Sequence, residues 1–430
     1  MPPSLRRHRL IALALIGVLG VLACNPVPEA PTGGSVRVVG SWSGAEEQAF
    51  LAMVRPFEQR TGISVDYVGT RDLNGLLWEA VAKDRPPDVA GLPGPGQMAE
   101  FARHGALVPL DEVIDIAQYK SDTVPTFIEL GTVDGQLVGV FIKATLKGLI
   151  WYNPKMYTLE VPNTWDELER QAERARRTGT STWCVGLESG GTSGWPGTDW
   201  IEDIVLRDSG PDVYDEWVAG RLPWSSPEIR AAWELFGQIT ADAHGGPAEE
   251  ISTNFGDAGN GLFKDPPECL FHHQATFMTE FFKSRAGARE GEYDFFPFPV
   301  MDQQFAGSIT GAGDLFGMFR DTPQARALMR YLVTPEAQAI WVRRGGALSV
   351  NRRVTDYPDD LSRRAADVLS NAQRFRFDGS DLMPERMNTA FLQAIIDYVR
   401  EPDTLDEILR RLDDVQRRAY QGEIMTQPVP

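Results

Sequence analysis

A glycine-rich stretch with two tryptophans and three carboxylates offers the clearest chemistry in the sequence. Trp195 and Trp200 lie within nine residues of Asp199, Glu202 and Asp203. Trp200 and Asp203 are three residues apart, a spacing that on a helix places an aromatic plane beside a hydrogen-bond acceptor. Exposed aromatic rings next to acids are typical of sugar recognition. The competing interpretation is that Trp200 belongs to the core.

A second set of residues follows the first three predicted strands. Trp42 and Ser43 come after the first strand, Asp72 after the second and Pro93 after the third, and Glu46 follows in the first helix. Ligands of open α/β sheets bind outside the carboxyl ends of the strands, so we expect these residues to lie side by side. An aromatic face, a carboxylate and free N–H groups at a helix start suit a polyol. The alternative is that Ser43, Glu46 and Asp72 only cap helices.

The segments that must position these residues alternate between strands and helices. β-branched and apolar runs at 35–40, 63–67 and 87–91 predict three short strands, each followed by a helix. This order indicates a parallel α/β layer with right-handed crossovers. Two further apolar runs flank residues 143–147, where a second α/β unit is expected to begin.

Several helix starts are also expected from local signals. Ser43-x-x-Glu46 and Thr164-x-x-Glu167 have the spacing of capping boxes. Thr322-Pro323 and Thr334-Pro335 each resemble an N-cap followed by proline in the first turn.

The composition excludes several classes of protein. The 430 residues include 42 Lys+Arg and 60 Asp+Glu, for a net charge of −18. Such an acidic surface repels nucleic acid and favours a neutral or cationic ligand. A metal site is not expected, because His272-His273 has no partner at metal-ligand spacing, and we expect no cofactor.

The N-terminus is expected to be an export signal. Three arginines precede an apolar run of 14 residues from Leu10 to Ala23, which is too short for a transmembrane helix. The run ends at Cys24 in a sequence like a bacterial lipobox, followed by a proline-rich tether up to residue 34. We therefore expect lipidation of Cys24 and anchoring to a membrane; the alternative is an ordinary signal peptide. Cleavage would change the net charge from −18 to −21.

Two cysteines remain once Cys24 is assigned to lipid. Cys184 and Cys269 form an even pair in an oxidising compartment, which favours a disulfide. Two separate buried thiols are the alternative.

The chain resembles the solute-binding lipoproteins of carbohydrate ABC transporters, in the group similar to maltose-binding protein. The resemblance extends from about Ser35 to Tyr420, and the 189–210 segment and the cysteine pair suggest the α-glucoside-binding branch. The segments that carry it are residues 40–46, 57–65, 86–90, 147–154, 161–168, 189–210 and 334–338.

This resemblance implies a two-lobed α/β fold, each lobe a mostly parallel sheet flanked by helices, with a hinge crossed several times and the ligand in the cleft. Residues 1–23 would be the signal peptide and 24–34 the lipidated Cys and tether. Lobe one would hold 35–144 plus 308–356, and lobe two 145–307 plus 357–430. The expected cleft residues, including Ser43 from the strand-end argument above, are Trp42, Ser43, Glu46, Asp72, Pro93, Lys147, Trp151, Trp195, Asp199, Trp200, Asp203, Phe277, Phe281, Asp314 and Arg352.

The expected function is capture of a carbohydrate, an α-glucoside of the maltose, trehalose or sucrose type. The sugar would bridge the lobes, and the closed form would deliver it to the permease of an ABC importer. The protein is expected to be an extracytoplasmic monomer without catalytic activity. The alternatives are another polyol or oligosaccharide on the same fold, or a secreted glycoside hydrolase, which also needs paired carboxylates.

Overall fold

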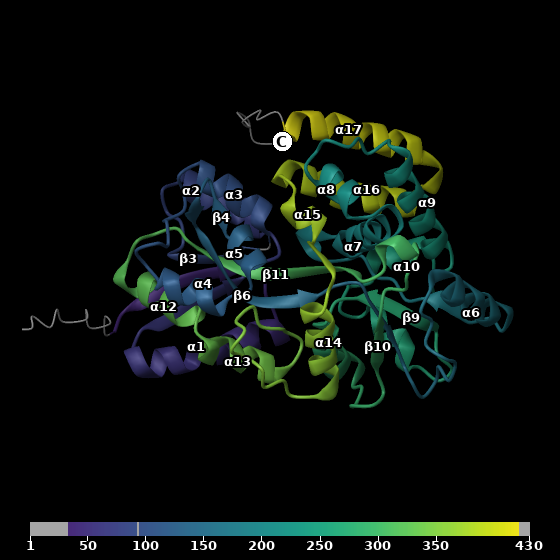
Figure 1. Ribbon diagram of the computed structural model, residues 1–430, viewed down its shortest axis with the longest axis horizontal. Helices are drawn as coiled ribbons and strands as arrows, with labels where there is room; N and C mark the ends of the chain where they lie inside the picture. Colours follow the sequence, from purple (N-terminus) through teal and green to yellow (C-terminus); the bar gives the residue numbers. More distant parts are fainter. Residues whose placement is uncertain (1–32, 93, 421–430) are drawn as a thin grey trace, which may run out of the picture. The chain divides into compact units, whose positions relative to one another are not determined.

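Two β-sheets, each flanked by helices, organise the chain (Figure 1). The computed structural model describes residues 33–92 and 94–420. The first sheet has the strand order β12-β11-β3-β1-β2, and β6 also pairs with β11. Its strands are β1 (Ser35–Gly40), β2 (Ser64–Gly69), β3 (Val89–Leu92), β6 (Gly139–Leu146), β11 (Ser308–Met318) and β12 (Arg374–Phe377).

The second sheet is smaller and has the order β10-β7-β9-β8. Its strands are β7 (Leu149–Tyr152), β8 (Ser181–Trp183), β9 (Cys269–Gln274) and β10 (Asp294–Pro297). A separate pair consists of β4 (Thr132–Val133) and β5 (Gln136–Leu137). The chain passes from the first sheet to the second between β6 and β7, and returns between β10 and β11. The lobe boundaries given above stay a prediction.

Both sheets are mixed: three of the five strand pairs of the first sheet are parallel, as expected, whereas two of the three pairs of the second sheet are antiparallel. β1 is parallel to β2 and β3, as the three strand–helix units predicted. β11, however, runs antiparallel to β3 and β6, since it enters the first sheet on the return from the second. In the second sheet β7 is antiparallel to β9 and β10, and β8 is parallel to β9.

Helices cover both sheets, and several begin where the sequence predicts. The helices are α1 (Ala45–Thr61), α2 (Leu73–Ala82), α3 (Pro95–Arg103), α4 (Ile116–Asp122), α5 (Pro125–Leu130), α6 (Trp165–Arg177), α7 (Trp195–Ile204), α8 (Pro211–Val218), α9 (Pro227–Ala241), α10 (Pro247–Ser252), α11 (Met278–Phe281), α12 (Pro323–Leu332), α13 (Pro335–Arg344), α14 (Asp360–Ser370), α15 (Gly379–Leu382), α16 (Glu385–Arg400) and α17 (Leu405–Tyr420). The Thr164 capping box is confirmed. Thr322 and Thr334 also accept backbone N–H groups at the starts of α12 and α13.

Two local expectations are wrong. The residue before α1 is Gly44, so Ser43 is not its cap and the capping box with Glu46 does not form. Glu46 contacts Lys143 instead. Residues 143–147 were expected to separate two strands, but β6 continues to Leu146, so Lys143 projects from a strand and only Lys147 and Gly148 separate β6 from β7.

The predicted disulfide between Cys184 and Cys269 is confirmed. The two Cα atoms are 5.5 Å apart, within the usual range for such a bond. The bond joins the residue after β8 to the first residue of β9. It therefore fixes the edge of the second sheet, beside the segment that leads into α7.

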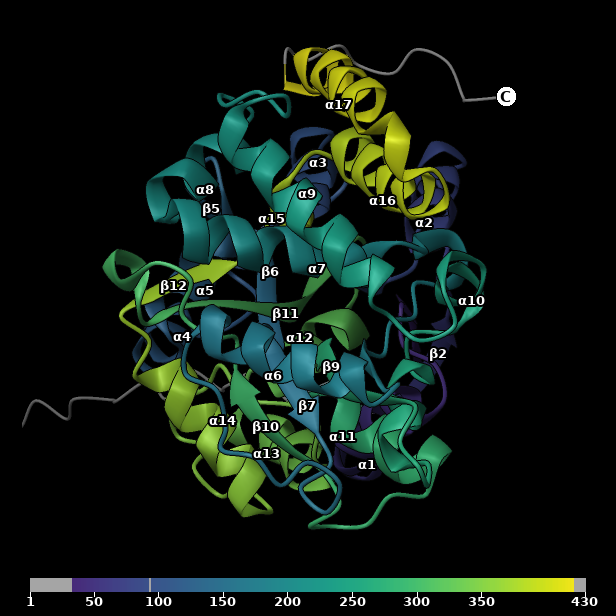
Figure 2. The same ribbon diagram turned by 90° about the vertical axis from the view of Figure 1, so that its right-hand side faces the viewer.

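The second sheet and the C-terminal helices share one apolar core. Figure 2 shows α16 and α17 side by side, next to α7 and α9. Large aromatic residues fill this region, among them Trp183, Trp217 and Trp233, all at most 1% exposed. Within the described ranges, none of the helices is long and apolar enough to cross a membrane.

Glu250, on α10, is a buried acid that lies outside the cavity described below. It is 0% exposed, and no described residue donates a hydrogen bond to either of its carboxyl oxygens. Burial raises the pKa of Glu250 from 4.5 to about 8. The folded protein therefore holds a proton that the unfolded chain has lost, and Glu250 makes stability fall as the pH rises from 4.5 towards 8.

Replacement of Glu250 by glutamine should remove this pH dependence. Between pH 6 and pH 7 we expect the wild type to lose about 1 kcal/mol of unfolding free energy relative to Glu250→Gln, since one pH unit corresponds to about 1.4 kcal/mol per proton. Urea denaturation of both proteins at the two pH values measures the difference. Parallel pH profiles would contradict the prediction.

Candidate functional site

A cavity of about 400 Å³ lies between the first sheet and helices α7, α15 and α16. The carboxyl ends of β1 and β2, the strands β6 and β11, helix α7 and the start of α16 all contribute to its walls. The polar and aromatic lining residues are Ser41, Trp42, Glu46, Arg71, Asp72, Asn74, Gln97, Lys143, Thr145, Lys147, Thr192, Trp195, Asp199, Phe255, Phe277, Asp314, Asp378, Ser380, Asp381, Glu385, Asn388 and Thr389.

Eight of the residues expected at the cleft line this cavity. They are Trp42, Glu46, Asp72, Lys147, Trp195, Asp199, Phe277 and Asp314. Trp42, Glu46 and Asp72 were expected from their places after strands, and Asp314 only from the resemblance; Trp42 Nε1 donates a hydrogen bond of 3.3 Å to Asp314 Oδ1. Their role in ligand binding stays a prediction.

Helix α7 presents a different face to the cavity from the one expected. Trp195 and Asp199, four residues apart, line it, whereas Trp200 and Asp203 do not. One residue turns the helix by about 100°, so Trp200 points into the core, where it is 2% exposed and packs on Trp183.

Asp203 is likewise buried, at 0% exposure. It pairs with Arg207 and with His273, whose Nε2 lies 2.7 Å from Asp203 Oδ2. Thr310 of β11 donates a hydrogen bond to the same carboxylate. Asp203 therefore joins α7 to both sheets and, contrary to expectation, does not line the cavity.

Trp151 and Phe281 also lie in the core. Trp151 is 0% exposed and its Nε1 donates to the Gln274 carbonyl oxygen at 2.9 Å, because β7 is buried on both faces. Phe281 is 5% exposed and packs on Phe255, behind the cavity wall. Both rings were expected at the cleft from the family resemblance, which does not specify the direction of each side chain in this chain.

Ser43 and Arg352 are exposed and lie away from the cavity lining. The Arg352 N–H donates to the Asp122 carbonyl oxygen at 2.7 Å, so its backbone joins the connection near α4. Pro93 and Cys24 lie outside the described residues.

Lys143 is a buried cation in the cavity wall that the sequence analysis missed. Its Nζ lies 3.0 Å from Glu46 Oε1 and 3.1 Å from Asp314 Oδ2. It also lies 4.6 Å from the centre of the Trp341 ring. A signal was available, because a lone lysine inside the apolar strand 139–146 has to be paired when the strand is buried.

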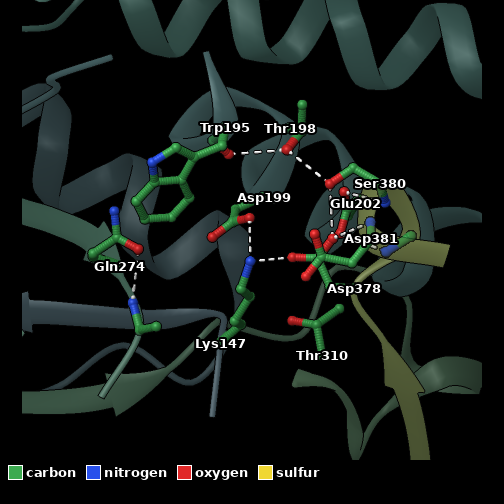
Figure 3. Close-up of polar contacts among 12 residues, drawn as sticks. Lys147, Trp195, Thr198, Asp199, Glu202, Gln274, Thr310, Asp378, Ser380 and Asp381 are labelled. Carbon is green, nitrogen blue, oxygen red and sulfur yellow. Dashed lines mark hydrogen bonds and ion pairs between the residues drawn. The ribbon is translucent and has the colours of Figure 1, made fainter. Parts of the chain in front are cut away.

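Lys147 contacts a second set of acids on the opposite wall (Figure 3). Its Nζ lies 2.7 Å from Asp199 Oδ1 and also contacts Asp378. We call Lys147, Asp199, Glu202, Asp378 and Asp381 the Lys147 cluster. Glu202 accepts the N–H groups of Gly379 and Ser380 at 2.8 and 3.0 Å, which fixes the start of α15 beside α7.

The pKa values of the cluster follow from burial and from this single cation. Burial raises the pKa of Asp199, Glu202 and Asp381 well above their ordinary values. Burial acts on Asp378 in the same direction, but the contact with Lys147 lowers its pKa below the ordinary value. For Lys147, burial favours the neutral form, yet Asp199 and Asp378 raise its pKa well above 10.5. Lys147 and Asp378 therefore form the ionised pair at the centre of the cluster.

Asp199, Glu202 and Asp378 are the one described group of acids that are near enough to hold a metal ion, with ligand atoms within 4.8 Å. The Lys147 ammonium already supplies a positive charge to two of these carboxylates. The donor set is thus that of an internal ion pair, and we do not assign a metal to it.

Arg71 reaches between the two walls at the edge of the cavity. Its Nη2 lies 3.8 Å from Glu46 Oε2, and its guanidinium carbon lies 5.1 Å from the centre of the Phe255 ring. The backbone of Gly191 lies against Arg71 and Asp72, where an added Cβ would be 3.5 Å from the Arg71 carbonyl oxygen. The loop before α7 and the β2–α2 connection therefore meet directly.

The comparisons with known proteins agree with this architecture. Residues 41–339 match the family described as bacterial extracellular solute-binding protein. The chain is 37% identical to the osmoprotective compounds-binding protein GgtB of Synechocystis sp., over 86% of this chain and 89% of that protein. It is 34% identical to the alpha-glucosides-binding periplasmic protein AglE of Rhizobium meliloti, over 87% of this chain and 85% of that protein.

Solved structures confirm the fold. A chitin oligosaccharide binding protein superposes with a TM-score of 0.79 at 16% identity, covering 91% of this chain and 100% of that chain. Maltose-bound MalE3 of T. maritima gives a TM-score of 0.68 at 17% identity, covering 90% and 99%. The two-lobed α/β architecture predicted from the sequence is therefore confirmed.

Proposed function

Because this chain belongs to the bacterial extracellular solute-binding proteins, we propose that its cavity captures a carbohydrate and delivers it to an ABC importer. The finer proposal is an α-glucoside of the maltose, trehalose or sucrose type. It is supported by the 34% identity to the alpha-glucosides-binding protein AglE. Another small polyol on the same fold is the alternative, and the 37% identity to the osmoprotective compounds-binding protein GgtB favours it.

The observation that carries the proposal is the pairing of an aromatic face with an unused acceptor. Trp195 lines the cavity and packs edge-to-face with Phe255, another lining residue, with ring centres 5.1 Å apart. Asp199 lies one turn further along α7, and its Oδ2 accepts no hydrogen bond from any described residue. A sugar ring can stack on the indole while one of its hydroxyls donates to this oxygen.

Capture rather than catalysis is proposed. In the family to which the chain belongs, the activity is solute binding. A ligand that touches residues of both walls would favour the arrangement in which they are close together, and this closed arrangement would be the form that the permease receives. We also propose an extracytoplasmic monomer held to the membrane by lipid on Cys24, as the sequence predicts.

A thermal-shift screen tests the function. Maltose, trehalose, sucrose and a small glucosylated polyol should each be added at a high concentration, with amino acids as controls. A sugar at about 100 times its dissociation constant should add roughly 2.7 kcal/mol to the unfolding free energy. No shift with any sugar would reject the proposal, and products in the sugar samples would reject capture without catalysis.

A further inference from the structure

The Lys147 cluster contains more acids than its cation can balance. Two of its four carboxylates, those of Asp199 and Asp378, contact the Lys147 ammonium. Glu202 is held by two backbone N–H groups, which donate hydrogen bonds without a full positive charge. If all four acids were ionised, the cluster would carry a charge of about −3, with Asp199, Glu202 and Asp378 at most 3% exposed and Asp381 partly exposed, which is unfavourable.

The charged groups around Asp199 do not correct this imbalance. Asp203 lies on the same helix and is paired with Arg207 and His273. The Tyr214 hydroxyl of α8 is uncharged and donates its hydrogen bond to the Phe377 carbonyl oxygen at 2.8 Å, so it supplies no positive charge to the cluster. Among the groups that influence Asp199 most strongly, only Lys147 favours its ionised form. Without a ligand, the unbalanced negative charge therefore favours retention of a proton on one acid of the cluster.

One oxygen of the cluster has no partner and belongs to a residue of the cavity wall. Asp199 is 3% exposed, and its Oδ1 contacts Lys147 while its Oδ2 has no hydrogen-bond partner in the described chain. Figure 3 shows this second oxygen turned towards the side of Trp195. A protonated carboxyl group tolerates such a position better than a carboxylate does, because it carries no net charge.

We propose that capture of a hydroxylated ligand releases about one proton from the Lys147 cluster, and that Asp199 is the group that exchanges the proton for a ligand hydroxyl. This inference rests on the carbohydrate-binding function proposed above. The Asp199 carboxyl group gives its proton to the solvent, and the ligand O–H, which keeps its own hydrogen, then donates to Asp199 Oδ2. Burial of Asp199 raises its pKa and so supports a proton in the empty cavity.

The sign of the resulting pH dependence follows from this exchange. The empty form binds one proton more than the ligand-bound form, so acid favours the empty form. Affinity should rise about tenfold for each pH unit until the empty form itself loses the proton, and then become constant.

Calorimetric titration in two buffers tests the proton release. Maltose, trehalose and sucrose are titrated into the protein at pH 7 in phosphate and in Tris, whose ionisation enthalpies differ. We expect release of about one proton per ligand, so the binding heat of the captured sugar should differ between the buffers by about the difference in their ionisation enthalpies. Equal heats in both buffers would overturn this inference and leave the proposed function standing. If none of the three sugars binds, the proposed function fails and this inference fails with it.

Two variants locate the proton. Asp199→Asn keeps the shape of the side chain but cannot lose a proton, so the difference between the buffers should vanish. Glu250→Gln removes a buried acid with a raised pKa that lies outside the cavity, so the difference should persist. Proton release that is lost in Glu250→Gln, or kept in Asp199→Asn, would overturn the assignment to Asp199. If Asp199→Asn does not fold, the measurement on the wild type still decides whether a proton is released.

Discussion

Replacing Lys147 by methionine should lower the unfolding free energy by about 3–5 kcal/mol at pH 7.5, the range found when one partner of a buried ion pair is removed. The Lys147 side chain is 9% exposed, and it contacts Asp199 and Asp378. Methionine fills a similar volume, so the loss comes from charge and not from a void. Without the ammonium, the acids of the cluster have to take up protons or remain buried as anions.

The pH dependence separates this explanation from a general loss of packing. In the wild type, Lys147 lowers the pKa of Asp378, so this contribution to stability is present above the ordinary pKa of 3.8 and is lost as the pH falls. In Lys147→Met, Asp378 loses this lowering and the already raised pKa values of Asp199, Glu202 and Asp381 rise further, so stability falls more steeply with rising pH than in the wild type. The difference in unfolding free energy between the wild type and Lys147→Met should therefore be larger at pH 7.5 than at pH 5, as measured by urea denaturation.

Lys155→Met is the matched control. Lys155 also pairs with a carboxylate, Glu292 at 2.9 Å, but its side chain is 62% exposed. Exposed ion pairs contribute about 0–1 kcal/mol, so this variant should lose less than about 1 kcal/mol at either pH. An equal loss for both lysine variants, or a loss for Lys147→Met that does not change with pH, would contradict the electrostatic account.

Trp195→Ala should weaken sugar binding by about 100-fold, or nearly 3 kcal/mol, while the protein stays folded. Trp195 lines the cavity and is only partly buried, so its removal takes away the proposed stacking face with a moderate cost in packing. Calorimetric titration with the captured sugar measures the affinity, and denaturation measures the stability.

Trp200→Ala provides the comparison within the same helix. Trp200 is 2% exposed, and its ring centre lies 4.1 Å from that of His273 and 4.8 Å from that of Trp183. Its removal should cost about 3–5 kcal/mol of stability, as for other buried large side chains. If Trp200→Ala lost binding without losing stability, or Trp195→Ala lost stability without losing binding, the division of α7 into a cavity face and a core face would be wrong.

Much of the fold could be predicted because local signals were strong. The runs at 35–40 and 63–67 gave β1 and β2 nearly to the residue, and Thr164, Thr322 and Thr334 do cap helices. The mixed character of the sheets could not be predicted in this way. The direction of β11 depends on where the chain returns from the second sheet, which is a long-range property without a local pattern.

The site was predictable where residues follow strands, and much less so where a side chain's direction matters. Trp42 and Asp72 line the cavity because they lie at strand ends. Trp195 and Trp200 have the same chemistry, and only the register of α7 decides which of them faces the cavity. Asp378 and Asp381 had no signal at all, since they are brought to Lys147 by the pairing of β12 with β11.

The pairing of β12 with β11 determines how late the cavity can form during synthesis of the chain. Lys147 is made early, but its partner Asp378 comes 231 residues later, and Asn388 and Leu392 of the cavity wall come later still. A growing chain therefore lacks one wall of its cavity until most of its length has been synthesised. The cavity is therefore among the last parts of the structure to be assembled, since a partly made chain lacks several of the residues that line it.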